Sequence, residues 1–270
     1  MGNLYIVALP LGNLNDITLR ALETLKSVDF IACEDTRTTK ILLQKYDISA
    51  KLLDCHKFNE QERSKRISDL LEKSDVALVS DAGTPCICDP GCVLIKNILQ
   101  NGHKIIPIPG ACALITFLSA VPRDNEFFTF VGFLPKTSQK RIELFEKHEN
   151  INCVFYESPN RLMKTLDDIL NKFGENKKIA IGRELTKFHE EIKTGTVTEI
   201  IKYYKENTLK GEIVGMVYAA SNEENADTTV LTEKIKLLKK QNFSDKDIAK
   251  ILSTLENTPK NAVYELSLNL

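Results

Sequence analysis

Small and polar residues form a dense cluster at 80–85 (SDAGTP), and their types suit ligand binding. Asp81 and Thr84 offer hydrogen-bonding side chains, while the small residues let backbone groups approach a ligand closely. The cluster follows an apolar run, Val76 to Val79, which is typical of a short buried strand. Open α/β sheets bind their ligands at the carboxyl ends of such strands. We interpret 80–85 as a binding loop; the alternative is an ordinary connection from a strand to a helix.

Charged residues also follow two other expected strands, Phe30 to Cys33 and Asn152 to Tyr156. The first is followed by EDTR at 34–37 and the second by ESPNR at 157–161. Polar residues directly after a buried strand indicate either a surface turn or a functional site, and the density of charge at 34–37 favours a site. The alternative is that each acid forms an ion pair with the arginine three or four residues later.

Composition limits the class of protein. The chain has 270 residues with a net charge of −1, so no global positive field favours nucleic acid, and any polyanion site must be local. No apolar run approaches the roughly 20 residues that cross a membrane. The N-terminus lacks the basic segment of a signal peptide and is typical of a first strand. We therefore expect a cytoplasmic globular protein without a membrane partner.

The seven cysteines are an odd number and are scattered along the chain. Without an export signal, they are expected to be reduced thiols that pack as small hydrophobic residues. Cys86, Cys88 and Cys92 lie close together, but their spacing is not that of common zinc sites and no fourth ligand is near in sequence. We expect no metal site.

Strands and helices alternate up to about residue 120, which predicts a mainly parallel sheet with crossover helices. Asp16 is the expected N-cap of the first helix. The expected strands are 4–9, 30–33, 52–56, 76–79 and 104–108, and helices are expected at 38–46, 60–73, 92–101 and 111–120.

A second unit is expected after a linker at 121–125. It begins with a strand at 127–133 and contains a helix, Leu162 to Phe173, that ends at Gly174. Beyond residue 221 the sequence becomes polar and then helical, at 232–240 and 245–255. The predicted domains are an N-terminal α/β lobe at 1–120, a C-terminal α/β lobe at 121–222 and a helical extension at 223–270.

Several clusters occur in one order that resembles a known family. They are IVALPLGNLNDITLRAL, EDTRTT, SDAGTP with DPG, IPGACALI, GFLP, FYESPNRL, RELTKFHEE and KGEIV, within residues 4–220. Together they resemble the ribosomal RNA small-subunit methyltransferase I group of the tetrapyrrole methylase superfamily. The resemblance implies an α/β fold of two lobes with a cofactor cleft between them, usually as a homodimer. It also implies S-adenosylmethionine-dependent methylation of a cytidine ribose 2′-hydroxyl in 16S rRNA, at the decoding centre of the small ribosomal subunit.

The resemblance also implies which residues bind the cofactor. Thr84 stands where most tetrapyrrole-modifying members have Asp, which favours the RNA-modifying branch. Cys86 and Cys88 replace the Gly and Ser that are common there, and Cys86 narrows the conformational freedom of the loop. Asn160 replaces a common His, so that position is not expected to supply an essential base. The implied cofactor-binding residues are Pro10, Asp81, Gly83, Thr84, Ile87, Cys112, Ala113, Tyr156, Leu185 and Glu212.

Methyl transfer to a hydroxyl requires in-line positioning, and a group that accepts the hydroxyl proton assists it. The acids and bases at expected strand ends are Glu34, Asp35, His56, Glu157, Glu184 and Lys187. We take Glu34, Glu157 and Lys187 as catalytic candidates, because a desolvated lysine can also act as a base. The sequence does not choose among them.

RNA contacts are expected from local basic residues, since phosphate neutralisation dominates affinity. The first cluster is Lys136, Lys140 and Arg141, and Arg20, Arg37 and Lys40 form a second. Arginines suit bidentate phosphate contacts, which adds Arg161 and Arg183. The alternative is an ordinary solvated helix face.

Two other functions share the expected fold. One is a tetrapyrrole or corrin C-methyltransferase, which Thr84 and the EDTR and RELTK clusters disfavour. The other is a non-catalytic cofactor-binding module associated with the ribosome, which the two loop cysteines favour.

Overall fold

The protein is described from a computed structural model, which covers residues 1–124, 126–207, 209–220, 228–256 and 258–270. Two compact units are present. The first comprises Met1–Lys147 and Asn152–Tyr218, and the second comprises His148–Ile151 and Ala219–Leu270. Asn125 of the predicted linker and the predicted boundary at 222/223 lie outside the described residues. The three-part division remains a prediction.

The first sheet has five strands in the order β3-β2-β4-β1-β5, and all four pairings are parallel. Its central strand, β4, is buried at every position, which explains its uninterrupted apolar sequence. Because the strands are parallel, the residues that follow them meet at one edge of the sheet. The strands are β1 (Asn3–Val7), β2 (Phe30–Cys33), β3 (Lys51–Asp54), β4 (Val76–Val79) and β5 (Lys104–Ile108).

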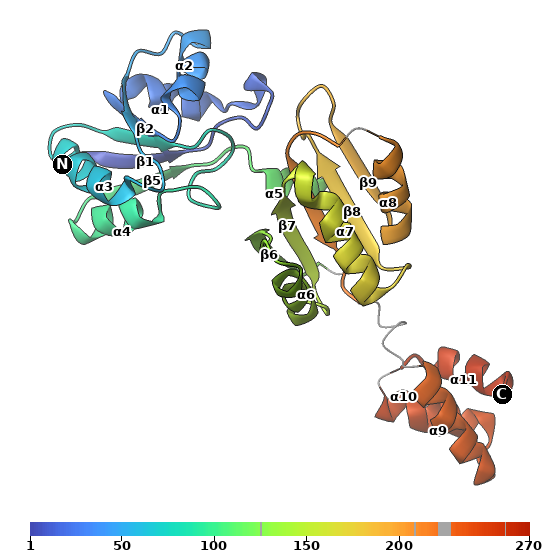
Figure 1. Ribbon diagram of the computed structural model, residues 1–270. Coiled ribbons are helices and arrows are strands. Elements are labelled where there is room, and N and C mark those ends of the chain that lie inside the picture. The colour runs from blue at the N-terminus through green and yellow to red at the C-terminus, as the bar shows by residue number, and fades with distance from the viewer. Residues whose placement is uncertain (125, 208, 221–227, 257) are drawn as a thin grey trace. The chain divides into compact units, whose positions relative to one another are not determined.

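Helices cover both faces of this sheet (Figure 1). Helices α1 (Leu19–Ser27) and α2 (Thr36–Lys45) pack on one face through a core that includes Leu25 and Leu42. Helices α3 (Glu60–Leu71) and α4 (Cys92–Gln100) pack on the other face through residues such as Ile67 and Leu94. The predicted layered α/β architecture is confirmed for this lobe.

The predicted starts of α1 and α2 were each wrong by two residues. Residues Leu14–Asp16 form a short 3-10 helix, and α1 begins only at Leu19, because the Thr18 side chain accepts a hydrogen bond from the Ala21 N–H at 3.1 Å. Helix α2 begins two residues earlier than expected, because Asp35 caps it by accepting from the Arg37 N–H at 2.8 Å. Asp16 and Thr18 are both residue types that favour the N-cap position, so residue type alone did not show which of them caps α1.

The second sheet has the order β6-β7-β10-β8-β9. Only β6 and β7 pair in parallel, and the other three pairings are antiparallel. Helices α6 (Ser138–Lys147), α7 (Pro159–Phe173) and α8 (Val197–Glu206) contribute to the core on one face. The strands are β6 (Phe128–Phe133), β7 (Asn152–Glu157), β8 (Lys178–Arg183), β9 (Glu191–Thr196) and β10 (Ile213–Val217).

Helix α5 (Ala113–Ser119) joins the two lobes of the first unit. It follows the last strand of the first sheet, yet Leu114, Phe117 and Leu118 pack against Val154 and Met216 of the second sheet. The Tyr156 hydroxyl on β7 also accepts a hydrogen bond from the Leu114 N–H at 3.1 Å. The start of α5 is therefore fixed by the second lobe.

Among its described residues the second unit contains three helices, α9 (Thr228–Lys240), α10 (Asp245–Leu255) and α11 (Lys260–Leu268). Their core includes Ile235, Ile248 and Val263, which are fully buried. The predicted helix at 245–255 is confirmed, and α9 begins four residues before its predicted start. Among the residues described for the whole chain, every helix is too short or too polar to cross a membrane.

A buried carboxylate fixes the start of α4, immediately after the predicted binding loop. Glu60 is 7% exposed, and its Oε1 accepts hydrogen bonds from the N–H groups of Gly91 and Leu94, each at 2.9 Å. Its negative charge also interacts favourably with the positive, N-terminal end of the helix dipole. The carboxylate therefore anchors the loop from outside the pocket.

Glu60→Ala is expected to lower the free energy of unfolding by about 2 kcal/mol, because two buried N–H donors lose their partner. Urea denaturation measures the change. Glu62→Ala is the matched control, since the Glu62 side chain on the same helix is 82% exposed; its effect should stay within about 0.5 kcal/mol. Equal losses in both variants would contradict the capping role.

Candidate functional site

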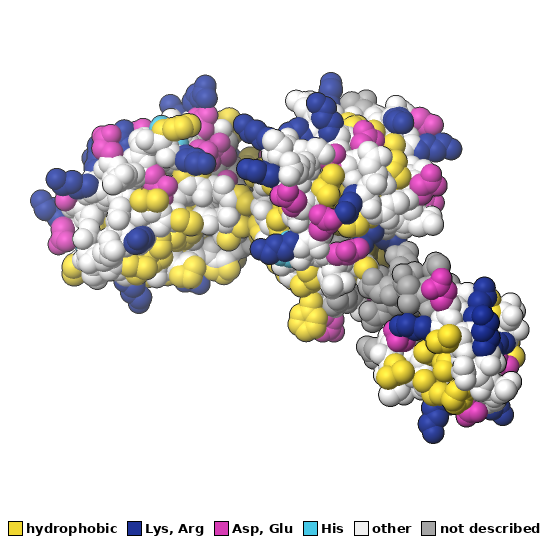
Figure 2. Space-filling view, turned by 60° about the horizontal axis from the view of Figure 1, so that its bottom comes forward, with side chains coloured by type: hydrophobic (Ala, Val, Ile, Leu, Met, Phe, Trp, Pro, Cys, Tyr) yellow, Lys and Arg dark blue, Asp and Glu magenta, His cyan; other side chains and the backbone are white. Residues whose placement is uncertain are grey.

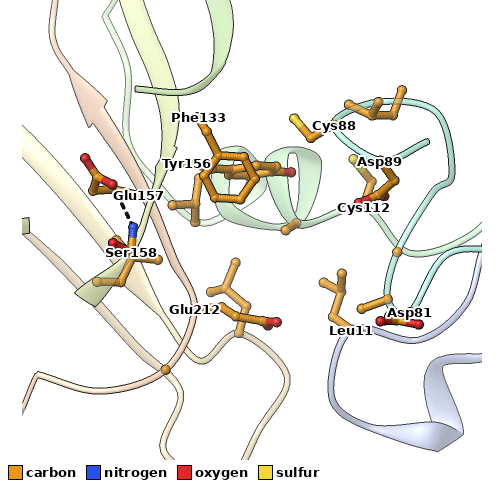
Figure 3. Close-up of a pocket in the computed structure, with 18 of the residues that line it drawn as sticks. Leu11, Asp81, Cys88, Asp89, Cys112, Phe133, Tyr156, Glu157, Ser158 and Glu212 are labelled. Carbon is orange, nitrogen blue, oxygen red and sulfur yellow. Dashed lines mark hydrogen bonds between the residues drawn. The ribbon is translucent and has the colours of Figure 1, made fainter. Parts of the chain in front are cut away.

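A pocket of about 440 Å³ lies within the first unit, where residues after β2 and β4 face residues of the second lobe. Figure 3 shows Leu11 and Asp81 on one side of the pocket and Glu212 on the other. The volume is in the range of small-molecule and cofactor sites. The sequence-predicted binding loop therefore forms one wall of a real cavity.

The loop after β4 is held by backbone and side-chain hydrogen bonds. Gly83 has a φ of +72°, and it exchanges two backbone hydrogen bonds with Leu9, both at 2.9 Å. The Thr84 hydroxyl donates to the carbonyl of Ala111 at 2.9 Å. These bonds tie the loop to the segments that follow β1 and β5, so three strand ends are joined at the pocket.

Cys86 occupies a backbone conformation that usually belongs to glycine, with a φ of +67°. Gly91 makes room for it, because a Cβ on Gly91 would overlap the Cys86 sulfur. The inference that Cys86 restricts the loop therefore has a structural basis. The seven cysteines are all free thiols, and among the described residues no group of His, Cys, Asp and Glu is arranged to hold a metal.

The pocket is acidic. Burial raises the pKa of Glu34, and the nearby charges of Asp81 and Asp89 raise it further. Burial is also the largest cause of the raised pKa of Asp81 and of Asp89. Among the described lining residues five are carboxylates and none is Lys or Arg, so a positively charged ligand is favoured over a phosphate; the five are Glu34, Asp81, Asp89, Glu157 and Glu212.

Glu157 is the most firmly held of these carboxylates. It is buried and accepts hydrogen bonds from the Ser158 N–H at 2.8 Å and from the Thr165 hydroxyl at 3.0 Å. It also forms an ion pair with Arg161 at 3.1 Å. The ion pair predicted as the alternative for this segment is therefore present. In the other segment, Arg37 pairs with Asp35 at 2.7 Å and leaves Glu34 facing the pocket.

Lys187 lies beside the pocket and bridges two carboxylates. Its Nζ is 2.8 Å from Glu184 Oε1 and 3.0 Å from Glu212 Oε2. Burial lowers the pKa of Lys187, but the hydrogen bonds to the two carboxylates outweigh burial and raise that pKa. The lysine is therefore a cation at neutral pH, whereas the hypothesis of a lysine base required a lowered pKa.

The basic residues expected to bind RNA fall into two groups. Arg37, Lys136 and Lys140 are exposed. Arg141 is 4% exposed and donates to Asp168 at 2.8 Å. Arg161 donates to the carbonyls of Leu134 and Pro135, and Arg183 lies 3.6 Å from Glu191, so these guanidinium groups have internal partners.

Most of the residues predicted to bind a cofactor line this pocket: Asp81, Gly83, Thr84, Ile87, Cys112, Ala113, Tyr156, Leu185 and Glu212. Pro10 is buried beside Leu11, which lines the pocket in its place. The sequence prediction missed Leu11, Asp89 and Phe133. The Asp-Pro-Gly signal at 89–91 and the position of Phe133 at a strand end could have indicated the last two.

Comparison with known proteins gives the family. The profile of the tetrapyrrole (corrin/porphyrin) methylases matches residues 3–201. The protein named "Ribosomal RNA small subunit methyltransferase I" of Halalkalibacterium halodurans is 41% identical over 98% of this chain and 94% of its own length. The chain belongs to the ribosomal RNA small subunit methyltransferase I family. Proteins of the same name from Vibrio cholerae and Escherichia coli O157:H7 are each 40% identical, over 98% and 99% of the chain and 94% and 95% of their own lengths.

Solved structures confirm the tetrapyrrole methylase fold expected of a ribosomal RNA small subunit methyltransferase I family member. Diphthine synthase matches with a TM-score of 0.67 and 14% identity over 81% of this chain and 90% of its own. Cobalt precorrin-4 methyltransferase matches with a TM-score of 0.61 and 18% identity over 80% and 94%. At these identities the likeness concerns the fold alone.

Proposed function

We propose that this protein transfers a methyl group from S-adenosylmethionine to the ribose 2′-hydroxyl of a cytidine in 16S rRNA, at the decoding centre of the small ribosomal subunit. The observation that carries the proposal is identity of about 40% over nearly the full length of proteins named for methylation of small-subunit ribosomal RNA. We propose a homodimer that acts in the cytoplasm.

The residues of the pocket fit this cofactor. S-adenosylmethionine supplies a methyl group on a sulfonium, and it also carries an ammonium, so it suits a pocket lined by carboxylates and free of lysine and arginine among its described residues. Gly83, Thr84, Cys112 and Ala113 would offer backbone groups, and Ile87, Tyr156 and Leu185 would offer apolar contacts. Asp81 and Glu212 would face the cationic groups, and Pro10 would support the loop beside them.

Glu34 is the best candidate for the group that accepts the ribose proton. It lines the pocket, and its raised pKa makes its carboxylate a stronger base than an exposed glutamate. No hydrogen bond within the described residues engages that carboxylate, whereas Glu157 has three partners. We therefore propose that Glu157 positions α7 and Arg161, and that the Lys187 cation holds Glu212 in place.

We propose that RNA is contacted by the exposed cations Arg37, Lys136 and Lys140. Arg141, Arg161 and Arg183 would act indirectly, because their guanidinium groups are bonded inside the protein. On the face in Figure 2, Lys and Arg side chains are interspersed with Asp and Glu side chains. A surface of this kind favours recognition of a shaped ribonucleoprotein over free RNA held by charge alone.

The test is methyl transfer from labelled S-adenosylmethionine to unmodified small ribosomal subunits, with naked 16S rRNA fragments in parallel. The expected result is label in 2′-O-methylcytidine, with faster transfer to subunits than to fragments. Label absent from RNA while the cofactor binds in calorimetry would contradict the proposal. Label that enters a porphyrin-type acceptor instead would favour the C-methyltransferase alternative.

Removal of all residues after 220 is expected to leave cofactor affinity unchanged and to reduce RNA methylation several-fold. The helices of the second unit have their own core, and the pocket is formed within the first unit. Seven lysines on the removed segment would be lost as phosphate contacts. Calorimetry with the cofactor and initial rates on subunits measure the two effects. An unchanged rate would show that the helical unit has no part in RNA binding.

A further inference from the structure

Phe188 is the most exposed large apolar side chain in the described part of the chain, at 96% exposure. It lies in the loop between β8 and β9. Single exposed apolar residues are common on protein surfaces, so exposure alone has no functional meaning. Two further observations distinguish Phe188: the hydrogen bonds within its loop and the place of that loop at the pocket.

The loop at 184–190 is braced by hydrogen bonds within itself. The Lys187 N–H donates to the Glu184 carbonyl at 3.0 Å, and the Glu190 N–H donates to the Lys187 carbonyl at 3.1 Å. Glu184 and Thr186 both have positive φ angles, +52° and +67°. Such conformations persist where surrounding bonds enforce them, and they are frequent at functional sites. The loop therefore holds Phe188 outward in a defined place.

The residue before Phe188 forms part of the rim of the pocket. The Lys187 ammonium is 3.0 Å from Glu212, which lines the pocket. The methylene groups of Lys187 fill the space beside Gly12, where a Cβ would overlap them, and the neighbouring Leu11 also lines the pocket. Leu11 and Glu212 are both visible in Figure 3. Phe188 is thus presented by a loop of the second lobe that contacts the first lobe beside the pocket.

We propose that Phe188 is a stacking platform for an unpaired RNA base adjacent to the methylated nucleotide. This inference rests on the proposed function. Proteins recognise unpaired RNA mainly by stacking bases on exposed aromatic rings. The His189 ring meets Phe188 edge-on, with centroids 5.0 Å apart and an interplanar angle of 84°. The Lys187 charge is balanced by two carboxylates, so stacking, not phosphate attraction, is the interaction that this loop offers.

The absence of tryptophan from the chain provides a direct test. Phe188→Trp introduces a single indole fluorophore at the proposed platform. Phe127→Trp is the matched control, because Phe127 is 75% exposed and precedes β6, at the opposite end of that strand from the pocket residue Phe133. Unmodified small subunits and an unstructured oligoribonucleotide are the probes. Indole emission should fall on RNA addition in the Phe188→Trp variant and stay constant in the control.

Phe188→Ala should raise KM for small subunits about tenfold, as expected for loss of one stacked base, while cofactor affinity and kcat stay constant. Phe188→Tyr should restore KM, whereas a merely structural role would not distinguish aromatic from aliphatic replacements. If the indole emission of Phe188→Trp does not fall on RNA addition in a preparation that still methylates subunits, the stacking proposal is overturned. A change in the oligomeric state of Phe188→Ala without a change in its KM would also overturn the proposal, because Phe188 would then be a dimer contact. Quenching by RNA without any methylation would retain the platform and contradict the proposed function.

Discussion

Thr84→Arg is expected to abolish cofactor binding and, with it, methyl transfer. Thr84 lines the pocket, and its hydroxyl donates to the Ala111 carbonyl at 2.9 Å. Arginine would lose this link between two loops and place a long side chain in a cavity of about 440 Å³. Its guanidinium would also occupy the region where carboxylates favour a cationic ligand. We expect the dissociation constant to rise at least ~100-fold, which corresponds to a loss of about 2.8 kcal/mol of binding free energy.

Calorimetry with S-adenosylmethionine measures the binding effect, and labelled transfer to small subunits measures the activity. Thr84→Ser is the matched control, because it keeps the hydroxyl that bonds to Ala111; its affinity for the cofactor should stay within about fivefold, since a lost methyl contributes under 1 kcal/mol. Urea denaturation confirms that both variants remain folded. Unaltered cofactor binding by Thr84→Arg would place the cofactor site elsewhere.

Glu34→Gln is expected to reduce kcat at least ~100-fold, the usual contribution of a general base, with unchanged cofactor affinity. The carboxylate is active only when ionised, and burial, Asp81 and Asp89 raise its pKa above the ordinary 4.5. The rate of the native protein should therefore fall as the pH is lowered through this raised pKa, and it should level off above it. Because glutamine does not titrate, the variant should lack this acid limb.

Glu157→Gln separates the two acidic candidates. Its side chain would keep the shape of Glu157 but leave the buried end of Arg161 without its charged partner. We expect this variant to lose about 1–3 kcal/mol of stability and to retain the acid limb of the rate. The opposite outcome, a limb that vanishes with Glu157→Gln and persists with Glu34→Gln, would exchange the proposed roles of the two residues.

The position of the pocket could be predicted from local sequence. Val76–Val79 has the composition of a doubly covered strand, and parallel strands bring their following residues to one edge. Asp81 and Thr84, the polar side chains of the predicted binding loop, lie in the pocket for that reason, together with Cys112, which the family resemblance implied. Tyr156 and Leu185 were predicted only through the family resemblance, because no local pattern relates the second lobe to the first.

Features that depend on partners distant in sequence could not be predicted. Arg141 was expected on the surface, but Asp168 on α7 lies 27 positions away and binds it inside the protein. The raised pKa of Lys187 depends in part on its hydrogen bond to Glu212, 25 positions away. The antiparallel order of the second sheet likewise results from strand pairing across the chain. Periodicity describes which face of an element is buried, and it contains no information on which element covers it.

The contact between Cys86 and Gly91 has an evolutionary consequence. Cys86 keeps its side chain only because position 91 has none, and Gly91 in turn has a φ of +136°, which disfavours any other residue there. The coupling runs in one direction: Cys86 fits because Gly91 leaves it room, whereas a side chain at 91 would meet the Cys86 sulfur and would also be strained at this φ. A library that randomises position 91 should therefore select glycine whatever residue stands at 86, whereas a library at position 86 should accept glycine as long as Gly91 is kept.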